Sequence, residues 1–272
     1  MSSGLESDLA NLHLRLQDDS DSSFFCINTS AFQKGKGVFA SRNFERGDLI
    51  LSERPIFCVA TYASHAELEP LWQNHIDVAV RDLSPANLDA YLSLQNSHNR
   101  CSCFRGDGPL MGIFATNAYG VSVRDGGICL KASRINHSCS PNARFCFDSN
   151  SGEIRIYALG TIARGEEISV SYIGCRRLFE RPRLSRQAHL RSRYHFTCAC
   201  PVCSLPEAES KRSDVRRQRI NELWNLVGHL TAPTQKDQCV NAAVEAMRLL
   251  REEGYWLDAA AFFNEARPVI HS

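Results

Sequence analysis

Three cysteines within six residues most strongly constrain how this chain can fold. They stand in the segment CACPVC as Cys198, Cys200 and Cys203, and this C-x-C-x-x-C spacing lets three thiolates face one metal ion. Zinc prefers four tetrahedral ligands in a structural site, so a fourth ligand has to come from another part of the chain. The spacing therefore predicts a metal centre that ties this segment to a distant one. Three incidental cysteines in a loop are the alternative.

The segment RINHSCSPN, residues 134–142, offers a fourth ligand. Cys139 stands at a sharp bend that Pro141 and Asn142 impose, and a bend suits a fixed ligand. A base–nucleophile pair is a second interpretation, because His137 and Cys139 are two residues apart and would point the same way on an extended strand. We favour the metal site, since a zinc-bound thiolate cannot also act as a nucleophile and the sequence marks no orienting Asp or Asn.

The composition favours a protein of a reducing compartment. The chain has 272 residues with 12 cysteines and a net charge of +1, so it can bury a sizeable core and has no general attraction to nucleic acid or anionic membranes. Residues 1–25 lack the pattern of a secretory signal, and no stretch is apolar for long enough to span a bilayer. We therefore expect a monomer in the cytoplasm, the nucleus or both, without disulfides or membrane contact.

The hydrophobic pattern predicts a mostly β (α+β) fold with two helical regions. Residues 1–30 are polar and acidic, and we expect them to be flexible. Short strand-like runs separated by Gly, Asn and Asp fill 31–60 and 112–173, and the latter include GIFATNAYGVSV. Apolar residues at helical spacing fill 62–98, where Ser84 is a candidate N-cap. Helical periodicity returns in INELWNLVGHL and AAVEAMRLLREEGYWLDAAAFF.

Seven arginines lie between residues 176 and 193. This run could bind nucleic acid or an acidic protein. A helix with a solvated, charged face explains the same run, and we favour that interpretation. Such a face would not by itself attract a basic histone tail.

Four segments, in this order along the chain, resemble a SET-domain protein lysine methyltransferase: GKGVFA (35–40), NHSCSPN (136–142), ARGEEISVSY (163–172) and CACPVC (198–203). The helical insert and the tail joined through cysteines are most similar to the SET-and-MYND branch. No zinc-finger spacing interrupts residues 50–100, so the chain looks like the fungal relatives that lack the MYND finger.

The resemblance implies the SET-domain β-fold, in which two separated stretches cross in a knot-like arrangement that carries the active site. Here RINHSCSPN and EEISVSY would cross. The implied parts are a flexible N-terminus at 1–30, a SET domain at 31–174 with a helical insert at about 61–110, a linker and zinc-bound post-SET segment at 175–203, and a helical C-terminal region at 204–272.

The resemblance also implies a site for the methyl donor S-adenosylmethionine. Gly35 and Gly37 lack side chains, so the backbone can approach the methionine end of the donor closely. Lys34 and Lys36 could meet its carboxylate. Phe196 matches an aromatic residue that stacks on the adenine, and ordinary core packing is the alternative. The other implied donor-binding residues are Asn117, Ser133, Asn136, His137 and Tyr172.

The implied activity is a protein-lysine N-methyltransferase acting on a histone or another protein with an accessible lysine. Tyr172 matches the terminal tyrosine of the family, which orients amine and methyl, and Tyr194 matches a second channel tyrosine. These two would be catalytic, and Cys139, Cys198, Cys200 and Cys203 would bind structural zinc. An inactive SET module that binds a partner and a methyltransferase for a non-protein acceptor are the alternatives. Because the sequence ends soon after a helical pattern, we also expect an open substrate groove.

Overall fold

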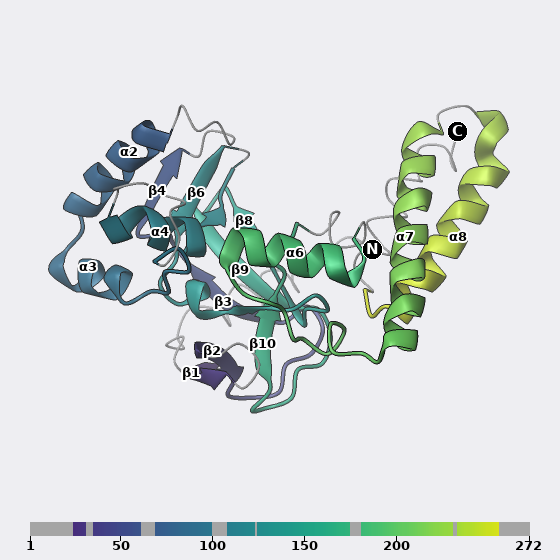
Figure 1. The fold of residues 1–272 in the computed structure, drawn as a ribbon, viewed down its shortest axis with the longest axis horizontal. Coiled ribbons are helices and arrows are strands. Elements are labelled where there is room, and N and C mark those ends of the chain that lie inside the picture. Colours follow the sequence, from purple (N-terminus) through teal and green to yellow (C-terminus); the bar gives the residue numbers. More distant parts are fainter. Residues whose placement is uncertain are drawn as a thin grey trace, which may run out of the picture.

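The computed structural model describes residues 24–30, 35–60, 69–99, 108–122, 124–174, 181–230 and 233–255 (Figure 1). The elements in chain order are β1 (Phe25–Ser30), β2 (Gly35–Ala40), β3 (Leu49–Glu53), β4 (Phe57–Ala60), α2 (Glu69–Arg81), α3 (Pro85–Leu92), α4 (Gly108–Asn117), β5 (Tyr119–Gly120), β6 (Asp125–Ile128), η3 (Ala132–Arg134), β7 (Asn136–His137), β8 (Ala143–Asp148), β9 (Glu153–Ala158), β10 (Glu167–Val170), α6 (Arg183–Tyr194), α7 (Glu207–His229), η4 (Pro233–Gln235) and α8 (Lys236–Glu252).

Short strands form the centre of the protein, as the sequence predicts. In the described residues they make three small sheets with the orders β1-β2-β10-β7, β3-β9-β8 and β4-β6-β5. The segment EIRIYA of β9 shows why these residues form strands. Ile154, Ile156 and Ala158 point into the core, and the residues between them are half-buried. This period of two is the pattern of a strand with one buried face.

The strands β7 and β10 bring together two segments that are more than twenty residues apart. They pair in parallel, with Ser169 opposite Asn136 and Val170 opposite His137. β10 also pairs antiparallel with β2. As a result GKGVFA, NHSC and EISV lie side by side in one sheet, which is the meeting of separated stretches that the sequence motifs predict.

The N-terminal strand corrects our expectation of a flexible segment over residues 1–30. Residues 25–30 form β1, which pairs with β2 along its whole length. Phe25 is buried in the core, and the hydroxyl of Ser30 donates to the Glu167 carboxylate at 2.8 Å. The polar, acidic run before residue 24 led us to expect flexibility over the whole range, although the segment FCINTS contains aromatic and β-branched residues that suit a strand. Residues 1–23 lie outside the described part of the chain.

The helical insert contains α2, α3 and α4, which pack together at one end of the protein (Figure 1). Ser84 caps α3 as predicted, because its hydroxyl accepts a hydrogen bond from the Asn87 amide at 3.3 Å.

The helix α4 corrects the strand that we expected from GIFATNAYGVSV. It runs to Asn117, and Met111 and Phe114 are buried among other apolar side chains of the insert. Near its end, the hydroxyl of Thr116 donates to the Gly112 carbonyl at 2.7 Å. A short, wholly apolar run fits a buried helix as well as a buried strand, so the pattern alone could not decide.

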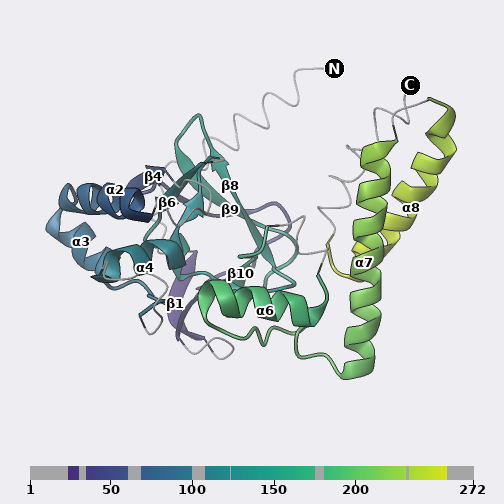
Figure 2. The same ribbon diagram turned by 45° about the horizontal axis from the view of Figure 1, so that its top comes forward.

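The C-terminal helices α7 and α8 stand side by side at the opposite end, and α6 lies between them and the insert (Figures 1 and 2). Leu190 of α6, Trp224 of α7 and Leu250 of α8 belong to one apolar cluster that also contains the four cysteines of the predicted metal site. The cysteine segment therefore lies where the β core meets the C-terminal helices. Among the described helices, none has the length and apolar character needed to cross a membrane.

Candidate functional site

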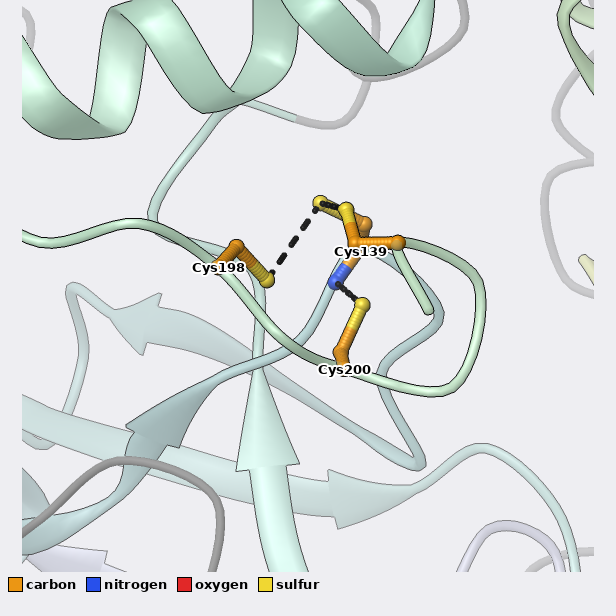
Figure 3. Close-up of side chains that lie close together, drawn as sticks. Cys139, Cys198 and Cys200 are labelled. Carbon is orange, nitrogen blue, oxygen red and sulfur yellow. Dashed lines mark hydrogen bonds between the residues drawn. The ribbon is translucent and has the colours of Figure 1, made fainter. Parts of the chain in front are cut away.

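Four cysteine side chains from two distant segments lie together in the interior (Figure 3). Their sulfur atoms are all within 4.8 Å of one another, and every side chain is buried. The Sγ atom of Cys139 lies 4.0 Å from that of Cys198 and 3.6 Å from that of Cys203. The backbone amide of Cys139 donates to the Sγ atom of Cys200 at 3.4 Å. Tetrahedral zinc with bonds of about 2.3 Å holds its sulfur ligands about 3.8 Å apart, so this cluster fits a zinc ion.

The pKa values of the four cysteine thiols also indicate a metal site. The hydrogen bond with Cys139 raises the pKa of Cys198 and lowers the pKa of Cys200, so the thiols compete for ionisation. A divalent cation at the centre removes the competition, because coordination stabilises every thiolate at once. The donor set therefore suits zinc in chemistry as well as in geometry.

A second group of predicted residues meets where β2 lies beside β10. The side-chain amide of Asn136 donates to the Lys36 carbonyl at 3.1 Å and to the Glu167 carboxylate at 2.7 Å. A Cβ atom at Gly37 would lie 2.4 Å from this carboxylate and 2.9 Å from the Asn136 amide nitrogen, so a side chain there would displace both groups. A Cβ atom at Gly35 would meet nothing within 4 Å. The strand from 35 to 37 and Asn136 thus form one close-packed cradle.

A cavity of about 400 Å³ collects four more of the predicted residues, namely Asn117, Ser133, Tyr172 and Tyr194. The hydroxyl of Ser133 donates to the Asn117 carbonyl at 3.1 Å. The side-chain amide of Asn117 donates to the carbonyls of Gln95 and Ile113, each at 2.7 Å. These bonds fix the end of α4 as one wall. No acidic side chain is present among the described residues that line the cavity.

The two tyrosines lie against each other, with ring centroids 5.0 Å apart. The hydroxyl of Tyr172 donates to the Ile135 carbonyl at 2.8 Å, which fixes its direction. Burial raises the pKa of Tyr172 and of Tyr194, so both hydroxyls stay protonated at neutral pH and act as hydrogen-bonding groups. The ring of Phe196 stands nearly perpendicular to that of Tyr172, with centroids 6.4 Å apart.

The ring of His137 connects the tyrosines with the cysteine cluster. Its Nδ1 accepts a hydrogen bond from the Tyr172 amide at 3.0 Å, and its Nε2 lies 3.2 Å from the Sγ atom of Cys139. Burial lowers the pKa of His137 to about 4, so the ring is neutral. Neither His137 nor Cys139 lines the cavity, and both are buried, so the structure does not favour the base–nucleophile pair.

The remaining predicted residues are less informative. Lys36 is exposed on β2, and Lys34 lies outside the described residues. The structure therefore gathers most of the predicted site residues into three neighbouring groups, which are the cradle, the cavity and the cysteine cluster.

The sequence did not reveal three aromatic residues of the cavity wall. Tyr119 and Phe145 pack edge to face with centroids 4.9 Å apart, and the Tyr119 hydroxyl donates to the Ala132 carbonyl at 2.8 Å. Tyr255, just after α8, also lines the cavity. The position of Tyr119 two residues after Asn117 is the one signal that could have marked it. Phe145 and Tyr255 carry no local signal, because only the fold brings them here.

Arg186 corrects our interpretation of the arginines between 176 and 193 as a solvated face. Arg191 and Arg193 are exposed on α6, as expected, but the side chain of Arg186 is fully buried. Burial alone would lower the pKa of Arg186, yet the pKa is raised, because the side chains of Cys139 and Cys203 lie nearby and favour the charged guanidinium. Arg186 and Leu190 are one turn apart on the face of α6 that packs inward.

A second buried arginine connects the C-terminal helices with the turn that carries Cys139. Arg217 of α7 donates to the Glu253 carboxylate and to the Tyr255 hydroxyl, each at 2.9 Å. Both Arg217 and the Tyr255 hydroxyl donate to the carbonyl of Cys139. One set of hydrogen bonds therefore joins α7, the end of α8 and the cysteine-bearing turn.

Comparison with known proteins gives relatives of one kind. A protein named histone-lysine N-methyltransferase set5, from Schizosaccharomyces pombe, is 29% identical over 69% of this chain and 53% of its own length. Protein-lysine N-trimethyltransferase SMYD5 from Mus musculus is 45% identical over 30% of this chain and 20% of its own. SET domain and MYND-type zinc finger protein 6, again from Schizosaccharomyces pombe, is 33% identical over 51% of this chain and 33% of its own. The chain thus spans about half or less of the length of these relatives.

The family model of the SET domain matches residues 35–173, just over half of the chain. This range begins at the glycine strand and ends directly after Tyr172, so it contains the cradle, the paired strands β7 and β10 and most of the cavity wall. The architecture and the family match agree, and the chain belongs to the SET-domain family.

Proposed function

We propose that this chain is an S-adenosylmethionine-dependent protein-lysine N-methyltransferase with a structural zinc ion. The observation that carries the proposal is the pairing of β7 with β10, which sets Asn136 of the cradle beside the strand that leads, two residues after its end, to Tyr172 of the cavity. The relatives support it, because their names describe transfer to lysine in histones and other proteins. The protein substrate would then be one with an accessible lysine.

The residues present fit the methyl donor. Gly35, Lys36, Gly37 and Asn136 would hold its amino-acid end, since the exposed backbone of Gly35 and Lys36 lies beside the polar Asn136 amide. Phe196 would pack against its adenine. The bound donor would supply a methyl group that is already activated on a sulfonium, so the protein has mainly to align the acceptor.

The cavity would lower the pKa of the substrate lysine amine and orient it. The amine has an ordinary pKa of about 10.4 and has to be neutral to act as a nucleophile. Aromatic walls without a carboxylate disfavour the ammonium form, so entry into the cavity lowers that pKa. The hydroxyl of Tyr172, fixed by the Ile135 carbonyl, can accept a hydrogen bond from the amine and set its direction. Tyr194 would narrow the space and limit how many methyl groups fit.

Two measurements test the proposal together. The first is calorimetric titration of S-adenosylmethionine into the zinc-loaded protein and into Asn136→Ala. The second is transfer of labelled methyl to a library of lysine peptides by the wild type, by Tyr172→Phe and by Tyr157→Phe, a matched control on β9 outside the cavity lining. We expect saturable binding that Asn136→Ala weakens, and transfer that only Tyr172→Phe reduces.

The outcomes separate the candidate functions. Binding of the donor without transfer to any lysine, but with transfer to small amines, would indicate a non-protein acceptor. No binding by a folded protein would refute the enzyme and favour an inactive SET module that binds a partner. Location in the cytoplasm or the nucleus stays a prediction, and nucleic-acid binding through residues 176–193 stays the less favoured alternative.

A further inference from the structure

The guanidinium of Arg186 lies in an environment that a cation does not ordinarily occupy. Its side chain is fully buried, and Leu190, one helical turn away, belongs to the same apolar cluster as the four cysteines. Its Nη1 donates to the Arg181 carbonyl at 2.6 Å and lies 3.4 Å from the Asp214 carboxylate. Its Nε has no hydrogen-bond partner among the described residues. A buried charge with an unpaired N–H is costly, so this group needs an anionic acceptor.

The cysteine cluster offers that acceptor once it holds zinc. Four thiolates around one divalent ion carry a net charge of −2 in a region from which water is excluded. A buried anion of this size requires nearby cations, and thiolate sulfur accepts hydrogen bonds from N–H groups. The turn of α6 that carries Arg186 lies against the cysteine segment, because the side-chain amide of the next residue, Gln187, donates to the Cys198 carbonyl at 2.9 Å.

Arg217 does not take this role, although it is equally buried. Its charge is already matched by the Glu253 carboxylate at 2.9 Å, and it donates to the Cys139 carbonyl at 3.4 Å. Arg217 therefore holds the ligand-bearing turn in place. Arg186 contacts Asp214 at a longer distance, and Asp214 also accepts a hydrogen bond from the Arg183 amide at 2.8 Å.

We propose that Arg186 is the charge-balancing residue of the four-cysteine metal centre and that its positive charge is required for tight zinc binding. The inference rests on the proposed zinc site, and it assigns to one arginine of the 176–193 run a role that is neither a solvated face nor a contact with nucleic acid. Removing the charge would weaken zinc binding by about 10- to 100-fold, the usual effect of losing a group that supports metal ligands.

The test separates the effect of the positive charge of Arg186 from the effect of the shape of its side chain. Arg186→Met and Arg186→Gln remove the charge at similar length, Arg186→Lys keeps it, and Arg212→Met removes an exposed arginine of α7 as the matched control. Zinc affinity is measured by competition with a chelator of known affinity, and the rate of zinc release is followed with a colour indicator. Absorption of the cobalt-substituted proteins reports whether four thiolates still bind tetrahedrally, independently of methyl transfer.

We expect the two neutral variants to lose about 10- to 100-fold in affinity while keeping the tetrathiolate cobalt spectrum, and Arg186→Lys and Arg212→Met to stay within a few-fold of the wild type. If Arg186→Met does not fold, Arg186→Gln and Arg186→Lys decide. Wild-type affinity in a neutral variant, or an equal loss in Arg186→Lys, would overturn the role of the charge. A wild-type protein that binds no zinc would overturn it too, and methyl transfer measured on that protein would still report on the proposed enzyme.

Discussion

Replacing Gly37 by alanine tests whether the cradle is built as tightly as its contacts indicate. The new Cβ atom would lie 2.4 Å from an oxygen of the Glu167 carboxylate, which has to retreat by about 1 Å to reach ordinary contact. That movement would stretch the hydrogen bonds that Glu167 accepts from Asn136 at 2.7 Å and from Ser30 at 2.8 Å. Hydrogen bonds to a charged group each contribute about 1.5–3 kcal/mol.

Without the Glu167 bond the Asn136 amide is no longer held toward the donor site, and restoring its orientation on binding would cost the free energy of that bond, which corresponds to about 10- to 150-fold weaker binding of S-adenosylmethionine at about 1.4 kcal/mol for each factor of ten. Gly35→Ala is the matched control, because its Cβ atom would meet nothing within 4 Å. Calorimetric titration of both variants gives the comparison. Glu167→Ala removes the same hydrogen bonds without adding a side chain at Gly37, and we expect a loss of affinity of similar size. Equal affinities for the Gly35 and Gly37 variants would refute the reasoning.

Three further perturbations act away from the cradle. Glu253→Gln leaves the buried Arg217 without its counterion, and we expect a loss of about 3–5 kcal/mol of stability in urea unfolding; an unchanged midpoint would contradict the buried pair. Burial lowers the pKa of His98 to about 4, and its Nδ1 lies 3.3 Å from Nε2 of His195. Because the pKa of His98 is below the ordinary 6.5 in the folded state, the unfolded chain takes up a proton at this residue before the folded protein does. The stability that comes from keeping His98 neutral is therefore complete above pH 6.5 and is lost as the pH falls toward 4. The melting temperature of the wild type should fall more steeply over this range than that of His98→Gln. Chelation of zinc should expose the segment around the four cysteines to proteolysis, while bound S-adenosylmethionine keeps the β core protected. Equal cleavage with and without the chelator would argue against a structural metal.

The cysteine cluster could be predicted because its signal is local. Three ligands fall within six residues, and the fourth stands at a bend marked by Pro141. The strands with alternating patterns, such as β9, were predictable for the same reason. In the CACPVC segment and in the strands, the residues that must lie together or face one way are close in the sequence, whereas the distant Cys139 was marked by its bend.

The errors arose where the surroundings decided the structure. The apolar run before Asn117 suits a strand or a helix, and packing inside the insert made it α4. In the sequence Arg186 resembles the exposed arginines of the same run, and only the fold shows that it is buried near Cys139 and Cys203. Phe145 and Tyr255 meet in the cavity although 110 positions separate them, and neither segment carries a sign of the other.

The cysteine cluster and the cavity share supports, which affects how variants should be interpreted. His137 receives a hydrogen bond from the Tyr172 amide and contacts Cys139 with its other nitrogen. Tyr255 lines the cavity and donates to the Cys139 carbonyl. Because two of its supports are anchored to the same cysteine, the cavity should change shape when Cys139 moves. A Cys139 variant without methyl transfer would therefore not show that the thiol is catalytic, whereas retained donor binding with loss of transfer would locate the damage at the tyrosines.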